Sequence, residues 1–135
     1  MSAWILATSI PCLAQEPISE REVFREAFLS DDSLPRYMRA HAGHKVKGTG
    51  LLEATMPRAY FDSSVPDANP AIAIIHIEPG RKVTCGLPKP VTREEMEIFR
   101  EGVAVAFSGE LADAQDWGEW RTVYLGNCLL TLRGD

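Results

Sequence analysis

Ala71-Ile-Ala-Ile-Ile-His-Ile77 is the stretch of sequence that decides the fold. Its apolar residues occupy both alternating faces, which is typical of a strand buried on two sides at the centre of a sheet. Pro79-Gly80 follows at once and indicates a turn into a second strand over Lys82–Cys85. The sequence therefore predicts a sheet with residues 71–77 near its centre.

Two further strands are expected close to the C-terminal end. Residues 120–125 and 128–132 flank Gly126-Asn127, and a two-residue loop that begins with glycine is typical of a type II′ hairpin. In such a hairpin Trp120 lies opposite Arg133, where an indole and a guanidinium form a cation–π contact. Trp120 and Arg133 are therefore the predicted binding pair.

Helices are marked by their starting residues. Ser19-Glu-Arg-Glu22 and Thr92-Arg-Glu-Glu95 both carry the Ser/Thr-x-x-Glu capping box, and an Asp32 start with a closing Gly43 predicts another short helix. After Thr92 the apolar stripe consists of Met96, Phe99, Val103 and Phe107, which predicts one long helix over about 92–113.

These elements predict an α+β fold. It consists of a mainly antiparallel sheet of about four to five strands, packed by the long helix and preceded by two shorter N-terminal helices. The chain of 135 residues is close to the usual size of one domain. We therefore expect a single small α+β domain over residues 15–135.

The charge of the protein excludes some classes of partner. The formal net charge is −5, and the lysines and arginines are scattered, whereas nucleic-acid binding requires clustered cations that neutralise phosphates. No apolar run reaches the roughly 18 residues of a membrane-spanning helix. The sequence thus predicts no nucleic-acid partner and no integral membrane segment, and it favours a protein partner.

The first 14 residues allow two interpretations. An apolar stretch over 3–10, followed by Pro11-Cys12 and by Ala14, resembles an export signal cleaved after Ala14, although a basic leader is missing. Export, the favoured interpretation, predicts a periplasmic or secreted protein in which Cys85 and Cys128 form a disulfide. The other interpretation is a first strand in a cytoplasmic protein with three buried thiols.

Three histidines are weak candidates for metal ligands. His41-Ala-Gly-His44 places two imidazoles three residues apart, with His76 and Cys85 as further ligands. Pairs of histidines at this spacing also arise by accident, and Gly43 is expected to end the helix between them. The sequence therefore predicts no metal and no other cofactor.

No catalytic constellation stands out in the sequence. A Gly-x-Ser-x-Gly nucleophile elbow is absent, and the acidic pairs lie at helix starts, where they stabilise the helix dipole. We therefore predict a small, acidic, non-enzymatic binding protein that acts through protein–protein contacts, such as an inhibitor, an immunity-type partner or an envelope accessory factor. The alternative is a small enzyme or a metal- or ligand-binding domain that uses His41, His44 or His76.

Overall fold

The computed structural model describes residues 16–58 and 64–133. In chain order the elements are β1 (Ile18–Ser19), α2 (Glu20–Ala27), α3 (Ser33–His41), β2 (Lys45–Pro57), β3 (Ala71–Glu78), β4 (Arg81–Leu87), α4 (Arg93–Ile98), β5 (Ala104–Asp116) and β6 (Arg121–Leu132). The predicted export signal over 1–14, and the alternative first strand, lie outside the described residues.

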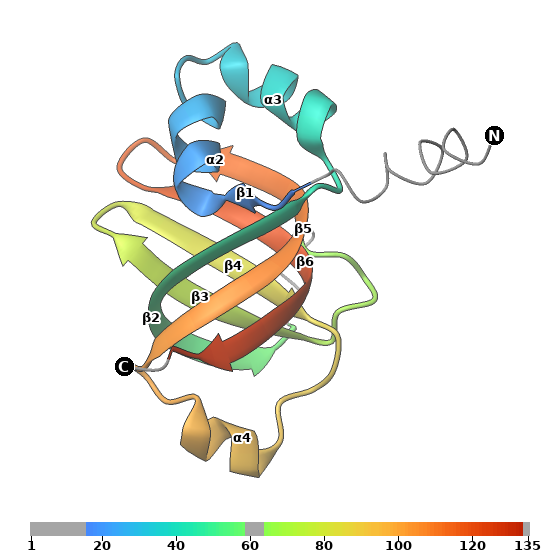
Figure 1. Ribbon diagram of the computed structural model, residues 1–135, viewed down its shortest axis with the longest axis vertical. Coiled ribbons are helices and arrows are strands. Elements are labelled where there is room, and N and C mark those ends of the chain that lie inside the picture. The colour runs from blue at the N-terminus through green and yellow to red at the C-terminus, as the bar shows by residue number, and fades with distance from the viewer. Residues whose placement is uncertain (1–15, 59–63, 134–135) are drawn as a thin grey trace, which may run out of the picture.

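The strands form one sheet that closes on itself. Its order is β1-β2-β3-β4-β6-β5, and a further pairing between β2 and β5 completes a barrel of β2 to β6 (Figure 1). Barrel neighbours are antiparallel except for β4 and β6, which run parallel, and short β1 adds a parallel pairing to β2. A five-stranded Greek-key barrel of this kind is the architecture of the OB-fold.

Helices lie at the two ends of the barrel. Figure 1 shows α2 and α3 at one end and α4 at the other. From α2, Val23, Phe24 and Ala27 are buried in the same core as the inward-facing residues of the strands. The strand residues of this core include Val46, Leu52, Ala73, Ile75, Val83, Val105, Leu111, Val123 and Leu125. Because α2 brings its apolar face to the barrel end, it completes the core there.

The predicted long helix over 92–113 is wrong. Helix α4 ends at Ile98, and Gly102 has a φ of 89°, a conformation that helical residues do not adopt. Residues 104–116 then form β5, in which Val105, Phe107 and Leu111 are buried. The predicted apolar stripe therefore joined a residue of α4, Met96, to a residue of β5, Phe107. Met96 does not pack into a core, because it is 48% exposed.

The predicted hairpin at Gly126-Asn127 is also wrong, because β6 is continuous from Arg121 to Leu132. Asn127 has a φ of 50°, and its backbone N–H donates to the side-chain oxygen of Asn69 at 3.0 Å. The Asn69 side-chain N–H in turn donates to the Asn127 side-chain oxygen at 2.9 Å. The glycine and asparagine therefore form an irregularity within one strand, held by a residue in the distant loop before β3.

The predicted α+β sheet with one long helix is thus replaced by a mostly β barrel with short helices. The local predictions that remain are the strands at 71–77 and 82–85, the two N-terminal helices and the capping box at Thr92, both bonds of which are formed. Strand β2, which pairs on both sides with other barrel strands, was not predicted.

Candidate functional site

A groove of about 560 Å³ lies on the outer face of β3, β4 and β6. Along these strands the core residues, such as Ile75, Val83 and Val123, point into the barrel, so the residues between them point outward. The groove is lined by Ile72, Ile74, His76, Gly80, Lys82, Thr84, Glu119, Trp120, Thr122 and Tyr124. The lining combines apolar, hydroxyl-bearing and charged side chains, and the charged ones include both signs.

Charged side chains pair beside the groove. Glu53 of β2 accepts a hydrogen bond from the Lys82 ammonium at 3.0 Å, and its other oxygen lies 3.6 Å from Nδ1 of His76. All three side chains are about one-third exposed, at 35–39%. Because exposed pairs of this kind contribute little to stability, these charges are available to a ligand at small cost.

The β5–β6 loop holds two tryptophans at the edge of the groove. The Trp117 and Trp120 rings are stacked, with centroids 5.6 Å apart, and are 55% and 41% exposed. The Trp117 amide donates to the Trp120 carbonyl at 2.9 Å, and the Gly118 amide donates to an Asp116 carboxylate oxygen at 2.9 Å. The φ of Gly118 is 86°, so this turn favours glycine. The indoles are therefore presented on an ordered turn.

Hydroxyl groups lie on the β6 side of the groove. The Tyr124 hydroxyl donates to the side-chain oxygen of Gln115 at 3.3 Å, and the Gln115 amide group donates to Ser64 at 3.0 Å. The Thr122 hydroxyl is buried and has no hydrogen-bond partner among the described residues. An unsatisfied buried hydroxyl is unusual in a native structure, and here it belongs to a residue that lines the groove.

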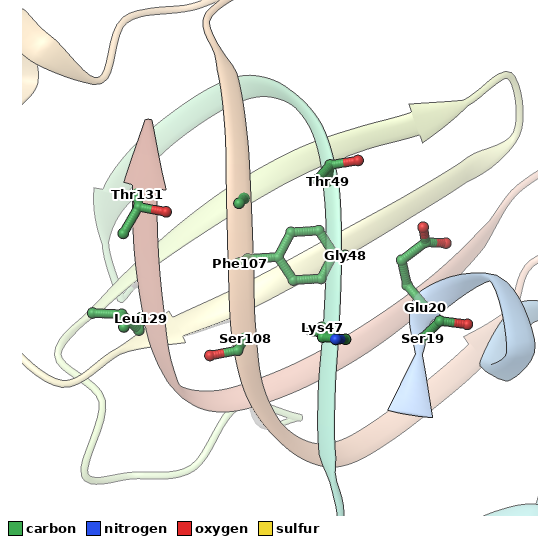
Figure 2. Close-up of a pocket in the computed structure, with 10 residues that line it drawn as sticks. Ser19, Glu20, Lys47, Gly48, Thr49, Phe107, Ser108, Leu129 and Thr131 are labelled. Carbon is green, nitrogen blue, oxygen red and sulfur yellow. The ribbon is translucent and has the colours of Figure 1, made fainter. Parts of the chain in front are cut away.

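A second, shallower pocket of about 460 Å³ lies over β2, β5, β6 and the start of α2. Figure 2 shows the Phe107 ring directed from β5 toward Gly48 on β2, with Glu20 beyond that glycine. A Cβ atom at position 48 would collide with the Glu20 side chain and lie 2.8 Å from the Phe107 ring. Burial raises the pKa of Glu20, as Glu78 does to a lesser extent, against the lowering effects of Arg21 and Arg81. The shape of this pocket therefore follows from the close packing of Gly48 against Phe107 and Glu20.

The structure separates the histidines that the sequence grouped as weak metal candidates. His41 and His44 meet, with their Nδ1 atoms 3.0 Å apart, whereas His76 lies in the groove and Cys85 in the core. Among the described residues, no group of three or more histidine, cysteine or acidic side chains is placed to hold a metal ion.

The predicted cation–π contact does not form, because Trp120 and Arg133 flank opposite ends of continuous β6. A binding role for these two residues stays a prediction. Trp120 itself lines the groove. Cys85 and Cys128 are buried free thiols that neighbour one another. The predicted disulfide between them remains a prediction. Burial, followed by the contact with Cys128, raises the pKa of the Cys85 thiol well above its usual value. Cys85 is thus a poor nucleophile.

Sequence reasoning missed most of the groove. Only Trp120 and His76 were singled out, and Glu53, Lys82 and Tyr124 were not. The available signal was the alternation along β3 and β4, whose outward residues could have been collected as one surface. The pairing of Glu53 with Lys82 and His76 could not have been found in this way, because β2 was not predicted.

Neither the models of known protein families nor the curated proteins give a match to this sequence. In the part of the chain that the structure describes, no helix has the length and hydrophobicity needed to span a membrane.

Proposed function

We propose that this protein is a non-enzymatic binding protein that takes a segment of a basic protein partner in the groove of β3, β4 and β6. The observation that carries the proposal is the stacked pair Trp117 and Trp120, which is exposed on an ordered turn beside an apolar groove. Exposed tryptophans that do not complete a core are typical of interface anchors. The net charge of −5 favours a basic partner.

The composition of the groove supports a polypeptide ligand. Ile74 and Trp120 supply apolar contact area, and Tyr124 supplies a hydroxyl group, whereas Ile72 and Thr122 are almost fully buried. Glu53 and Lys82 form an ion pair in the unbound protein. On binding, each of them is able to pair instead with an opposite charge of the bound segment. A surface that combines aromatic and aliphatic side chains with polar ones is usual in a protein–protein interface.

Nucleic acid is a weaker candidate for this groove. OB-folds bind oligonucleotides and oligosaccharides on the corresponding face, but that likeness concerns the fold and not the site. Lys82 and His76 face Glu53 and Glu119 in or beside the groove, so the site lacks the excess of cations that phosphates require. A neutral oligosaccharide is the second candidate, since the exposed face of Trp120 offers a surface on which a sugar ring stacks.

Site-specific photo-crosslinking in the native host tests the proposal. One variant carries a photoreactive phenylalanine at position 120, and the matched control carries it at Leu129, which is 66% exposed and lines the second pocket. We expect one protein to be captured from position 120 and not from position 129. Capture from both positions at equal yield, or from neither, contradicts the proposal.

Affinity for the captured partner then tests the anchor. We expect Trp120→Ala to weaken binding about 30-fold or more, which corresponds to the 2 kcal/mol typical of an interface hot spot. Leu129→Ala is the control and should leave the dissociation constant within a factor of three. If titration with a neutral oligosaccharide quenches the tryptophan fluorescence of the wild type and no protein is captured, the second candidate replaces the first.

A further inference from the structure

His41 and His44 lie in an ordered setting at the end of α3. Gly43, with a φ of 88°, separates them, and its amide donates to the Leu111 carbonyl at 2.8 Å. The Leu111 amide donates back to the His44 carbonyl at 2.8 Å. These two backbone hydrogen bonds tie the turn to β5, so the spacing of the two histidines is set by the barrel.

The ring of His41 is held as well. The Tyr37 ring packs on it with centroids 4.3 Å apart, and the His41 and His44 rings meet edge to face at 5.1 Å. The result is a 3.0 Å separation between the two Nδ1 atoms. A neutral pair fills this separation with one shared hydrogen bond, in which one Nδ1 donates and the other accepts.

The same separation fits chelation of a metal ion. Two imidazole nitrogens about 2.0–2.1 Å from a metal, with an angle of roughly 90–110° at the ion, are about 2.8–3.4 Å apart. The observed 3.0 Å lies within that range. An ion that replaces the shared proton therefore requires rotation of the rings and little displacement of the backbone.

Carboxylates stand beside the pair. Glu16 and Glu22 line the same pocket of about 220 Å³ as His41 and His44. Lys45, which also lines it, opposes a cation. Since no third ligand is already gathered among the described residues, the remaining positions around an ion fall to water or to a carboxylate that moves inward.

We propose that His41 and His44 form an open, two-histidine site for a divalent transition-metal ion of the zinc or copper class, with Glu16 or Glu22 as a further oxygen ligand. Imidazole is a ligand that both metals accept, and a site with open positions binds exchangeably. The site lies away from the groove of β3, β4 and β6. It is therefore independent of the proposed function.

Calorimetric titration of the chelator-treated full-length protein with Zn²⁺ at neutral pH tests this site. We expect one ion to bind each chain, with at least a tenfold loss of affinity in His41→Ala and in His44→Ala. His76→Ala is the matched control, because that histidine lies in the groove, and Cys12→Ser excludes the thiol outside the described residues. Neither control should change the affinity.

A measurement on the wild type keeps the test valid if a variant fails to fold. With ¹⁵N-labelled histidine, Zn²⁺ should shift the Nδ1 resonances of two histidines and leave the third unchanged, and Cu²⁺ should broaden the same two. Absence of Zn²⁺ binding up to millimolar concentration, equal binding by the His41→Ala and wild-type proteins, or a shift of the His76 resonance would overturn the proposal.

Discussion

The two hollows on the outside of the barrel differ in what their side chains do. Around the second pocket, small residues and Gly48 allow Phe107 and Glu20 to approach closely, so that surface is a consequence of packing. In the groove of β3, β4 and β6, large side chains such as Trp120 project outward without completing the core. The aromatic ring of the second pocket is buried, whereas Trp117 and Trp120 beside the groove are exposed. Exposed aromatic side chains, and not the hollow itself, therefore distinguish a candidate binding surface from a consequence of packing.

Phe107→Ala should cause the largest loss of stability, and it tests whether the second pocket is a product of core packing. The ring is 3% exposed and belongs to the core, so its removal should lower the free energy of unfolding by about 3–5 kcal/mol. Denaturant unfolding measures the change. Trp120→Ala is the control, and as a surface change it should cost no more than about 0.5 kcal/mol. Equal costs for the two variants would abolish the distinction between the hollows.

A disulfide between Cys85 and Cys128, which are both buried in the barrel, gives the next largest expected effect on stability. If the protein is exported, oxidised glutathione should remove two hydrogens and form the predicted bridge, which closes a loop of about 43 residues. A bridge of this kind typically stabilises by about 2–4 kcal/mol. Intact mass and unfolding with and without reductant measure it, with Cys128→Ser as the control. A chain that keeps both thiols under oxidising conditions contradicts the prediction.

Ionisation of Tyr37, which lies in α3, should cause a smaller loss of stability that is limited to alkaline pH. Burial, followed by Glu22 and Glu26, raises the pKa of Tyr37 to about 12, against about 10 in the unfolded chain. Between these values the folded state holds the proton more tightly, so stability is complete below pH 10 and falls as the pH rises to 12. The loss is at most about 2–3 kcal/mol.

Unfolding of the wild type and of Tyr37→Phe at pH 9 and pH 11.5 measures this loss. The variant keeps the ring that packs on His41 and lacks the ionisable hydroxyl, so its stability should fall less over the same interval. Identical pH dependence in the two proteins would show that Tyr37 does not carry the effect. Binding in the groove should be the same in both proteins at neutral pH.

Local signals in the sequence were sufficient for the starts of helices and for two strands. The Thr92 hydroxyl accepts from the Glu95 amide at 3.1 Å, and the Glu95 carboxylate accepts from the Thr92 amide at 2.9 Å. Hydrogen bonding from the Thr92 backbone amide, and then from the Thr92 side chain, lowers the pKa of the Glu95 carboxyl. Both partners lie within one helical turn, and the alternation of 71–77 is equally local, so neither depends on the rest of the fold.

What the tertiary structure decided involves partners far apart in the chain. Residues 104–116 form a strand because they pair with both β2 and β6, and Asn69 holds Gly126-Asn127 within β6 across 58 residues. The groove likewise joins outward residues of β3, β4 and β6 with Glu53 of β2. Sequence patterns report the preference of a segment for helix or strand, whereas barrel closure satisfies the backbone hydrogen bonds of all segments together. That collective requirement overrode the helical spacing after Thr92 and placed the candidate site.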